Sequence, residues 1–335
     1  MKVNAFTTGY NAPSARYRVR QNVPFLKKLG VHVNEIYSKS GSFPPPDRLK
    51  QLLWAASNLT ENSIKMLSQP SADVTWLQKV LMSKHYTFEG FLKRPLVFDV
   101  DDAIFIPQED FVKKIALQSQ KIICGNSFLA NNFSRWNTNI DIIPTAVDVS
   151  RYDNIVPTKS KDFFYILWTG TQSGFPFVYQ IEKALKIIVD RYDYVKIKIV
   201  SDLPPTFKIL EPNDYIFNYW NREIEFSSIV NADIGIMPLK ATDRSRGKCS
   251  YKMLCYMAAK LPVVVSPIGM NKEVLDLGKI GFGPTNIDEW VDALEQLVIN
   301  SKLHDECSKN AFDVVNSGFD IKTVSKQIKK TFTSL

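Results

Sequence analysis

The chain has 335 residues and a formal net charge of +8, with 45% hydrophobic and 23% charged residues. These proportions are ordinary for a globular protein, and the length favours two domains. No run of about 18 apolar residues occurs, which argues against a membrane-spanning helix. The N-terminus, MKVNAFTTGY, lacks the apolar stretch of a signal peptide, so a cytoplasmic location is expected.

The four cysteines and three histidines do not form a metal-binding or disulfide pattern. No two cysteines have C-x-x-C spacing, and the histidines are scattered along the chain. We therefore expect reduced thiols and no metal site. The cysteines are Cys124, Cys249, Cys255 and Cys307.

The positive charge is concentrated in the first half of the chain. Residues 1–160 contain 20 Lys and Arg against 13 Asp and Glu, whereas residues 161–335 contain 22 against 21. Such an excess suits a phosphorylated substrate or an anionic membrane surface, and a scattered, solvated excess is an equal alternative. No nucleic-acid reader motif accompanies the charge, so nucleic acid is not an expected partner.

In chain order, short apolar runs alternate with helical patterns. This alternation predicts a parallel sheet covered on both faces. In the first half, strands are expected at 3–6, 31–36, 74–77, 96–100, 121–124 and 140–143, and helices at 17–29, 47–56, 111–118 and 127–135.

A polar segment at 149–162 (VSRYDNIVPTKSKD) is expected to be a linker, after which the alternation restarts. Two α/β domains with parallel sheets are therefore predicted. Ligands of such sheets bind beyond the carboxyl ends of the strands, so a cleft between the two domains is the expected site. Strands are expected at 163–168, 195–200, 215–217, 234–237 and 263–266, and helices at 177–189, 226–230, 251–259, 288–299, 301–315 and 321–331.

The stretch GKCSYKMLCYMAAKLPVVVSPIG at 247–269 has the features of an anion site. Ser250 is an acceptable helix N-cap, and Gly247 permits close backbone approach. Lys248 and Lys252 lie at the helix start, where free N–H groups also attract anions. A bound diphosphate is the interpretation favoured here, with a solvated basic loop as the alternative. Arg244 and Arg246 precede the stretch, and Leu254, Met257, Ala258 and Leu261 form the expected core stripe.

Three further stretches offer polar groups near strand ends. Gly170 and Thr171 follow an expected strand and suit phosphate or sugar contacts. Ser14, Arg16 and Arg18 stand at a helix start, where arginine opposes the helix dipole unless an anion binds. Their alternative is a solvated turn. Asp99, Asp101 and Asp102 could bind a metal, orient sugar hydroxyls or cap the next element.

Several of these stretches together resemble a known family. The chain resembles the retaining, nucleotide-sugar-dependent glycosyltransferases of group 1 (family 4), which have the GT-B fold of two Rossmann-like domains facing across a cleft. The resembling pieces occur in the family's order. They are SARYRV at 14–19, FDVDDAIF at 98–105, GNSFLANNF at 125–133, IIPTAVDVSRY at 142–152, WTGT at 168–171, NADIGIMPL at 231–239 and GKCSYKMLCYMAAKLPVVVSPIGMNKEV at 247–274.

The resemblance implies an acceptor-binding domain at 1–152, a nucleotide-sugar-binding domain at 153–318 and a C-terminal helix at 319–335 that crosses back to the first domain. Asp101 falls where many relatives have a histidine near the transferred sugar, and with Lys248 and Lys252 it completes the implied catalytic set. The implied donor contacts are Gly170, Thr171, Arg244, Arg246, Gly247, Cys249, Ser250 and Cys255, and the implied acceptor contacts are Ser14, Arg16, Arg18 and Asp102.

One departure from the family concerns two acids. Most members have glutamates where this chain has Gly247 and Cys255, and a thiol is a poor acceptor for a ribose hydroxyl. The missing acids support one alternative, a non-catalytic relative that binds a nucleotide sugar. A GT-B epimerase is a second alternative.

The function implied is sugar transfer from a nucleotide diphosphate, UDP-linked in preference to GDP-linked, to a glycan or lipid-linked acceptor. The resemblance implies retention of configuration. We expect no metal and no separate cofactor, because cations would stabilise the leaving diphosphate. The setting implied is bacterial surface polysaccharide or glycoconjugate synthesis. Basic pairs such as Lys27–Lys28, Lys93–Arg94 and Lys113–Lys114 could bring the enzyme to the inner face of the plasma membrane.

Overall fold

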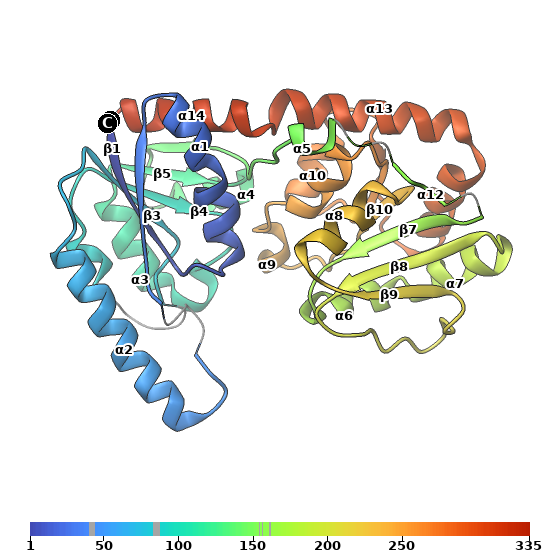
Figure 1. Ribbon diagram of the computed structural model, residues 1–335, viewed down its shortest axis with the longest axis horizontal. Coiled ribbons are helices and arrows are strands. Elements are labelled where there is room, and N and C mark those ends of the chain that lie inside the picture. Colours follow the sequence, from blue (N-terminus) through green and yellow to red (C-terminus); the bar gives the residue numbers. More distant parts are fainter. Residues whose placement is uncertain (40–43, 83–87, 154, 156, 161) are drawn as a thin grey trace. The chain divides into compact units, whose positions relative to one another are not determined.

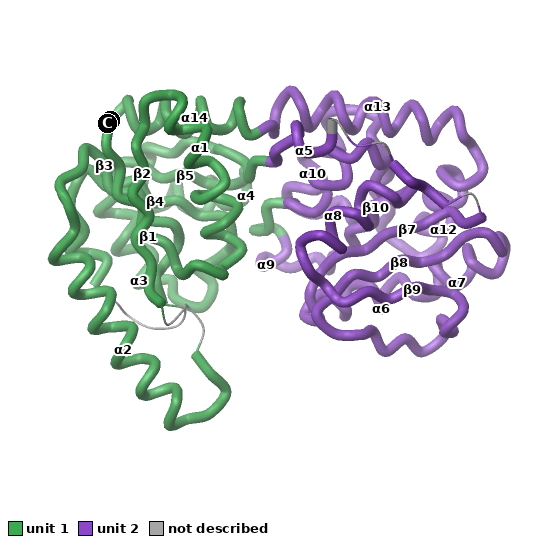
Figure 2. The backbone as a smooth tube through the Cα atoms, viewed as in Figure 1, with its two compact units in different colours: residues 1–146, 246–249, 321–335 green, residues 147–245, 250–320 purple. Residues whose placement is uncertain are grey.

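Two parallel sheets of six strands each organise the chain in the computed structural model (Figure 1). The structure describes residues 1–39, 44–82, 88–153, 155, 157–160 and 162–335. The chain divides into two compact units (Figure 2). Unit 1 comprises Met1–Ala146, Arg246–Cys249 and Ile321–Leu335, and unit 2 comprises Val147–Ser245 and Ser250–Asp320.

The sheet of unit 1 has the strand order β2-β1-β3-β4-β5-β6. Its central strands are buried and carry mostly apolar side chains, which pack on both faces of the sheet. On one face they pack against α1 and α14, and on the other Phe98 meets Phe133 of α4 at a centroid distance of 5.9 Å. The strands are β1 (Lys2–Thr7), β2 (His32–Tyr37), β3 (Val74–Gln78), β4 (Leu96–Val100), β5 (Lys121–Cys124) and β6 (Ile140–Ile142).

The first helical segment of unit 1 is irregular. Residues Ala15–Val19 form a π-helix (η1), which is followed by a 3-10 turn (η2, Arg20–Asn22) and by α1 (Val23–Lys28). The prediction of one regular helix at 17–29 is therefore wrong. The remaining elements are α2 (Arg48–Leu67), η3 (Glu89–Phe91), α3 (Phe105–Gln118), α4 (Ser127–Phe133) and α14 (Ile321–Thr333).

The last helix, α14, packs on unit 1. Its apolar residues Ile321, Val324, Ile328 and Phe332 are buried in the same core as β1 and β3. The Phe332 ring meets Trp76 at 5.3 Å between centroids, and Ser325 donates a hydrogen bond of 2.9 Å to Asn22. The apolar stripe of this helix thus explains why the end of the chain belongs to unit 1.

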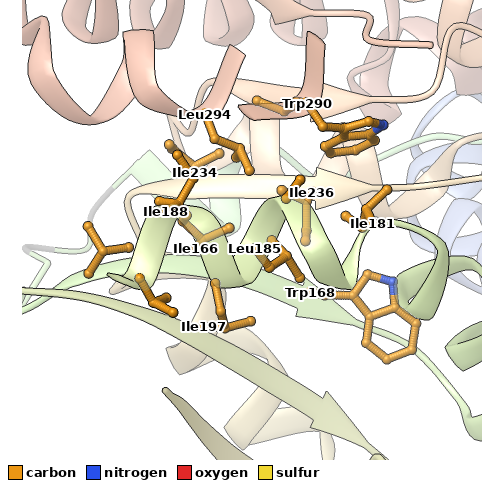
Figure 3. Packing of buried hydrophobic residues seen from close by; sticks show 14 of the residues in the cluster. Ile166, Trp168, Ile181, Leu185, Ile188, Ile197, Ile234, Ile236, Trp290 and Leu294 are labelled. Carbon is orange, nitrogen blue, oxygen red and sulfur yellow. The ribbon is translucent and has the colours of Figure 1, made fainter. Parts of the chain in front are cut away.

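The sheet of unit 2 has the order β12-β11-β10-β7-β8-β9. Figure 3 shows its core, in which isoleucines of the central strands pack against the two tryptophans Trp168 and Trp290. The strands are β7 (Phe164–Thr169), β8 (Val195–Ser201), β9 (Tyr215–Tyr219), β10 (Ile234–Met237), β11 (Val263–Val265) and β12 (Gly281–Phe282).

Three helices of unit 2 start at asparagine caps. The side chains of Asn221, Asn286 and Asn300 each accept a hydrogen bond from the backbone N–H three residues further on. The elements are α5 (Ser150–Asp153), η4 (Gln172–Gly174), α6 (Phe175–Gln180), α7 (Glu182–Arg191), α8 (Arg222–Val230), α9 (Asp243–Arg246), α10 (Tyr251–Ala258), α11 (Met270–Leu275), α12 (Ile287–Ile299) and α13 (Ser301–Gly318).

The predicted fold class, two α/β units with parallel sheets, is confirmed. Every predicted strand is present. Among the described residues, the α-helices α5, α9 and α11, the 3-10 helices η3 and η4, and β12 were not predicted. The linker predicted at 149–162 is wrong at its start, where α5 forms and Tyr152 packs on Phe226 with centroids 5.1 Å apart. Residues 154, 156 and 161 of that segment lie outside the described residues. Within the described part of the chain, no helix is both long and apolar enough to cross a membrane.

Gly235 of β10 allows α10 to sit close to the sheet. A Cβ atom at this position would lie 2.3 Å from Cδ2 and 2.4 Å from Cγ of Tyr256, whose ring is fully buried. The Tyr256 hydroxyl accepts a hydrogen bond of 3.0 Å from the Thr169 N–H at the end of β7. The helix is thereby fixed against the strand end.

We predict that Gly235→Ala lowers the free energy of unfolding by about 1–3 kcal/mol, because α10 must move away from the sheet. Gly318→Ala is the matched control. No heavy atom lies within 4 Å of a Cβ there, so that variant stays within about 1 kcal/mol of wild type. Urea unfolding of the two variants measures both effects. Equal unfolding midpoints would contradict the role given to Gly235.

Candidate functional site

The carboxyl end of β7 and the start of α10 meet in unit 2. A Cβ atom at Gly170 would lie 2.3 Å from the Trp168 ring and 2.8 Å from the Lys252 ammonium nitrogen, so only glycine fits there. The Lys252 ammonium lies 5.1 Å from the centroid of the Trp168 ring, a cation–π distance. Gly170 and Lys252, both predicted from the sequence, are therefore neighbours in the structure.

The loop after Gly170 presents hydroxyl groups. Thr171 and Ser173 are exposed, and their hydroxyl oxygens are 2.8 Å apart. The Gln172 N–H donates a hydrogen bond of 2.6 Å to Asp202 after β8, which holds the loop in place. The Gly170 N–H is already bonded to the Val200 carbonyl, so this amide is not available to a ligand.

The start of α10 differs from the prediction at Ser250. Its backbone is left-handed (φ +50°), and its hydroxyl makes no capping bond but donates to the Asn271 side chain at 2.6 Å. Ser250 thus occupies the N-cap position as predicted, but its side chain caps no backbone N–H. The N-terminus of α10 carries the partial positive charge of the helix dipole, which attracts anions.

Cys255 lies one turn into α10 and is buried. The hydroxyl groups of Tyr152 and Tyr251 make hydrogen-bonding contacts to its sulfur, and burial raises the pKa of the thiol to about 12. The position predicted to touch the donor ribose thus holds a neutral thiol. The expected core stripe is confirmed, since Leu254, Met257, Ala258 and Leu261 are all buried.

The segment Arg246–Cys249 belongs to unit 1, where its backbone is tightly held. The Asn126 side chain donates hydrogen bonds to the carbonyls of Arg246 (3.1 Å) and Lys248 (3.0 Å). A Cβ atom at Gly247 would lie 2.7 Å from the backbone N of Ala103, so a glutamate cannot occupy this position without a backbone shift. The Cys249 thiol donates to the Asp101 carbonyl at 3.3 Å.

The predicted donor residues are thus divided between the two units. Lys248 and Cys249 belong to unit 1, whereas Lys252 and Gly170 belong to unit 2. Arg244 lies on α9 and is exposed, as is Arg246.

Arg18 is committed to a buried ion pair in unit 1. Its guanidinium donates to Asp99 at 2.7 and 3.0 Å and to the Ile143 carbonyl at 2.8 Å, and the Trp76 N–H donates to the other Asp99 oxygen at 3.0 Å. Both charged side chains are at most 2% exposed. This placement favours a structural role for Arg18, predicted as an acceptor contact, since no part of it faces solvent.

A lysine that the sequence analysis did not single out lies beside Asp101. The Lys79 ammonium is 2.9 Å from the Asp101 carboxylate and 3.8 Å from that of Asp102, and it donates to the Ser14 hydroxyl at 2.8 Å. Gln78 also donates to Asp101, at 3.2 Å. Lys79 follows β3 and has a left-handed backbone (φ +57°). This conformation is rare for a residue with a side chain and is found more often at functional sites.

The charges of this cluster are balanced. Burial acts to raise the pKa of Asp101, but Lys79 and Arg18 hold it below its ordinary value. Asp99 and Asp101 each have a cationic partner, which disfavours the metal alternative for these carboxylates. No group of three His, Cys, Asp or Glu side chains suited to a metal occurs among the residues that the structure describes.

Two other predicted acceptor residues are more accessible. The Asp102 side chain is 42% exposed at the margin of the cluster. Arg16 is half-buried, with its guanidinium 4.4 Å from the Tyr17 ring centroid and a hydrogen bond of 2.5 Å to the Tyr17 hydroxyl. Ser14, Asp101 and Asp102 are therefore gathered around Lys79, at the carboxyl ends of β3 and β4.

We predict a pH-dependent loss of stability in Lys79→Met. The wild-type Asp101 carboxylate contributes stability above its unfolded-state pKa of about 3.9, and this is lost as the pH falls through the lower folded-state pKa. Without Lys79 a buried carboxylate loses its closest cation, which costs about 3 kcal/mol at pH 7. The deficit shrinks near pH 4, where the lone carboxyl becomes protonated.

Urea unfolding at several pH values measures this effect. Lys186→Met is the control, because the Lys186 pairs with Asp190 and Asp214 are at the surface and are expected to contribute less than about 1 kcal/mol. A Lys79→Met deficit that is the same at pH 7 and pH 4 would show that the ion pair is not its cause.

Comparison with known proteins gives a family match over part of the chain. The family model described as glycosyl transferases group 1 matches residues 177–300, most of which belong to unit 2. No curated protein matches the chain in sequence.

Solved structures with the same fold cover nearly the whole chain. Sucrose-phosphate synthase from Thermosynechococcus elongatus matches with a TM-score of 0.69 at 11% identity, over 99% of this chain and 98% of that one. Anabaena HepE in complex with UDP and glucose has a TM-score of 0.69 at 14% identity, with full coverage of both chains. WaaG, a glycosyltransferase involved in lipopolysaccharide biosynthesis, has a TM-score of 0.67 at 12% identity, over 99% of this chain and 100% of that one.

These likenesses show the GT-B fold. Residues 177–300 match the family model of group 1 glycosyltransferases, in agreement with the motifs quoted from the sequence.

Proposed function

We propose that this glycosyltransferase moves a sugar from a UDP-linked donor to a glycan or lipid-linked acceptor, with retention of configuration and without a metal ion. UDP is preferred to GDP because the similar Anabaena HepE was solved with UDP and glucose. A role in bacterial surface polysaccharide synthesis is supported by the similarity to WaaG.

The observation that carries the donor site is the close approach of Gly170 to Lys252. Because Gly170 has no side chain, the Trp168 ring and the Lys252 ammonium can lie directly against its backbone, where a Cβ atom would collide with both. The first turn of α10 adds backbone N–H groups beside Gly170 and Lys252. These two residues and the first turn of α10 are called the donor corner below. A diphosphate placed there would receive an ammonium, several amides and the partial charge of a helix N-terminus.

This corner is suited to stabilising a leaving group. When the bond from the anomeric carbon to the phosphate oxygen breaks, negative charge grows on the diphosphate, and fixed donors lower the barrier if they already face it. Each charge-assisted hydrogen bond contributes about 1.5–3 kcal/mol net. We propose Lys252 as the principal cation, with Lys248, Arg244 and Arg246 as further contacts to the donor.

The missing acids limit the mechanism. Ala103 leaves no room for a glutamate at position 247, and Cys255 is a buried neutral thiol, so neither position supplies a carboxylate nucleophile. Retention is therefore proposed to proceed without a covalent enzyme intermediate, with a donor phosphate oxygen taking the proton of the acceptor hydroxyl. Asp101, held ionised by Lys79, would orient the sugar.

The acceptor is proposed to bind unit 1 at the carboxyl ends of β3 and β4. Ser14, Asp101 and Asp102 offer hydroxyl and carboxylate oxygens that suit sugar hydroxyls, and Lys79 suits a phosphate of a lipid-linked acceptor. Arg16 stands in the same stretch of η1 and is a further candidate contact.

The donor site is tested by the thermal stabilisation that UDP produces. At a concentration of about 100 times its dissociation constant, UDP stabilises the wild type by about 2.7 kcal/mol. We predict that Lys252→Met, which keeps the aliphatic stem over Trp168 but removes the charge, loses most of this shift. Chelation of divalent metals by EDTA is expected to leave the wild-type shift unchanged.

Lys302→Met is the matched control, since Lys302 is an exposed lysine of α13 in the same unit. Its UDP-dependent shift is expected to equal that of wild type. A full shift in Lys252→Met, or a shift that requires metal, would reject the proposed site.

A further inference from the structure

The long helix α2 of unit 1 carries its large apolar side chains on the outside. The residues at positions 49, 53, 56, 60, 64 and 67 recur with helical spacing and lie on one face. This face is exposed, with aliphatic side chains that are 58–83% accessible. Figure 1 shows α2 extending past the strands of unit 1. The exposed aliphatic residues are Leu49, Leu52, Leu53, Ile64 and Leu67.

The opposite face of α2 is buried but half polar. Trp54 and Met66 are buried there together with Asn58 and Asn62, whose side chains are 3.5 Å apart. A helix that serves only to cover a core would place its leucines inward and its asparagines outward. The reversed arrangement indicates that something other than water covers the leucines, because contiguous exposed apolar patches mark interaction sites.

The charges of α2 identify the covering surface. Arg48 and Lys50 are exposed, and their positions at the first turn lie on either side of the apolar stripe. Glu61 is the only acidic residue within α2, and it is engaged by Lys65 and by Ser38. Apart from Asp47, the exposed N-cap whose carboxylate accepts the Lys50 N–H, the outward side of α2 offers aliphatic groups and cations, which complements an anionic surface.

We propose that α2 docks this protein on a lipid bilayer with anionic headgroups. The helix lies in the plane of the interface, with the leucines among the upper acyl chains and Arg48 and Lys50 at the level of the phosphates. This inference concerns binding alone and does not rest on the proposed reaction.

Vesicle flotation of the full chain tests the proposal. Wild type is expected to float with vesicles of phosphatidylcholine and phosphatidylglycerol, and much less with phosphatidylcholine alone. Leu52→Gln/Leu53→Gln is expected to bind at least about tenfold more weakly, because glutamine side chains do not gain the free energy that leucine side chains gain when they leave water. Arg48→Gln/Lys50→Gln should lose about tenfold on the anionic vesicles and retain the weak binding to neutral ones.

Two double variants serve as controls. Leu203→Gln/Leu277→Gln removes two exposed leucines of unit 2, and Lys302→Gln/Lys309→Gln removes two exposed charges of α13. Both are expected to float like wild type. Thermal unfolding of every variant confirms that these exposed substitutions leave the fold intact.

Two results would overturn the proposal. One is flotation that Leu52→Gln/Leu53→Gln does not weaken, or no flotation of wild type with anionic vesicles. The other is a wild-type dimer in sedimentation velocity that the same leucine variant converts to a monomer, which would assign the stripe to a second copy of the chain.

Discussion

The contact of Gly170 with Trp168 and Lys252 is the constraint on which the donor side of the molecule depends. The Trp168 ring fills the space where side chains of Gly170 and Gly174 would lie, and the Lys252 ammonium rests above it. One helix turn further on, Tyr256 bonds to Thr169 and covers Gly235. Three glycines and two large aromatic rings thereby fix the first turn of α10 against the end of β7.

The two units use their cations differently. In unit 1, Arg18 and Lys79 neutralise the carboxylates Asp99 and Asp101 at the strand ends, and these pairs are largely buried. Such pairs contribute little net stability but are costly to break, so they fix geometry more than they add free energy. In unit 2, the Lys252 ammonium lies over the Trp168 ring, and it is proposed to contact the donor diphosphate.

Much of the fold could be predicted from the sequence because the strands are continuous apolar runs. The predicted strands at 96–100 and 121–124 have the observed bounds of β4 and β5. Short elements were missed where tertiary contacts decide the structure. For example, α5 forms in a polar segment because Tyr152 packs on Phe226, and η1 adopts π geometry around the buried Arg18.

The donor corner was more predictable than the acceptor cluster. Gly170 and Lys252 lie in motifs whose local pattern already indicates an anion site, and the structure brings them together. Lys79 carries no such signal, since a lone lysine after an apolar strand looks like a surface residue until Asp101 is placed beside it. The exposure of Arg18 was likewise misjudged, because its partner Asp99 is distant in the sequence.

A crystal structure of the full chain with UDP is the most direct measurement of the central claim. The expected result is a diphosphate within hydrogen-bonding distance of the Lys252 ammonium and the first-turn N–H groups of α10, next to Gly170. A diphosphate bound elsewhere, with the Lys252 ammonium still resting on Trp168 and contacting no ligand, would contradict it.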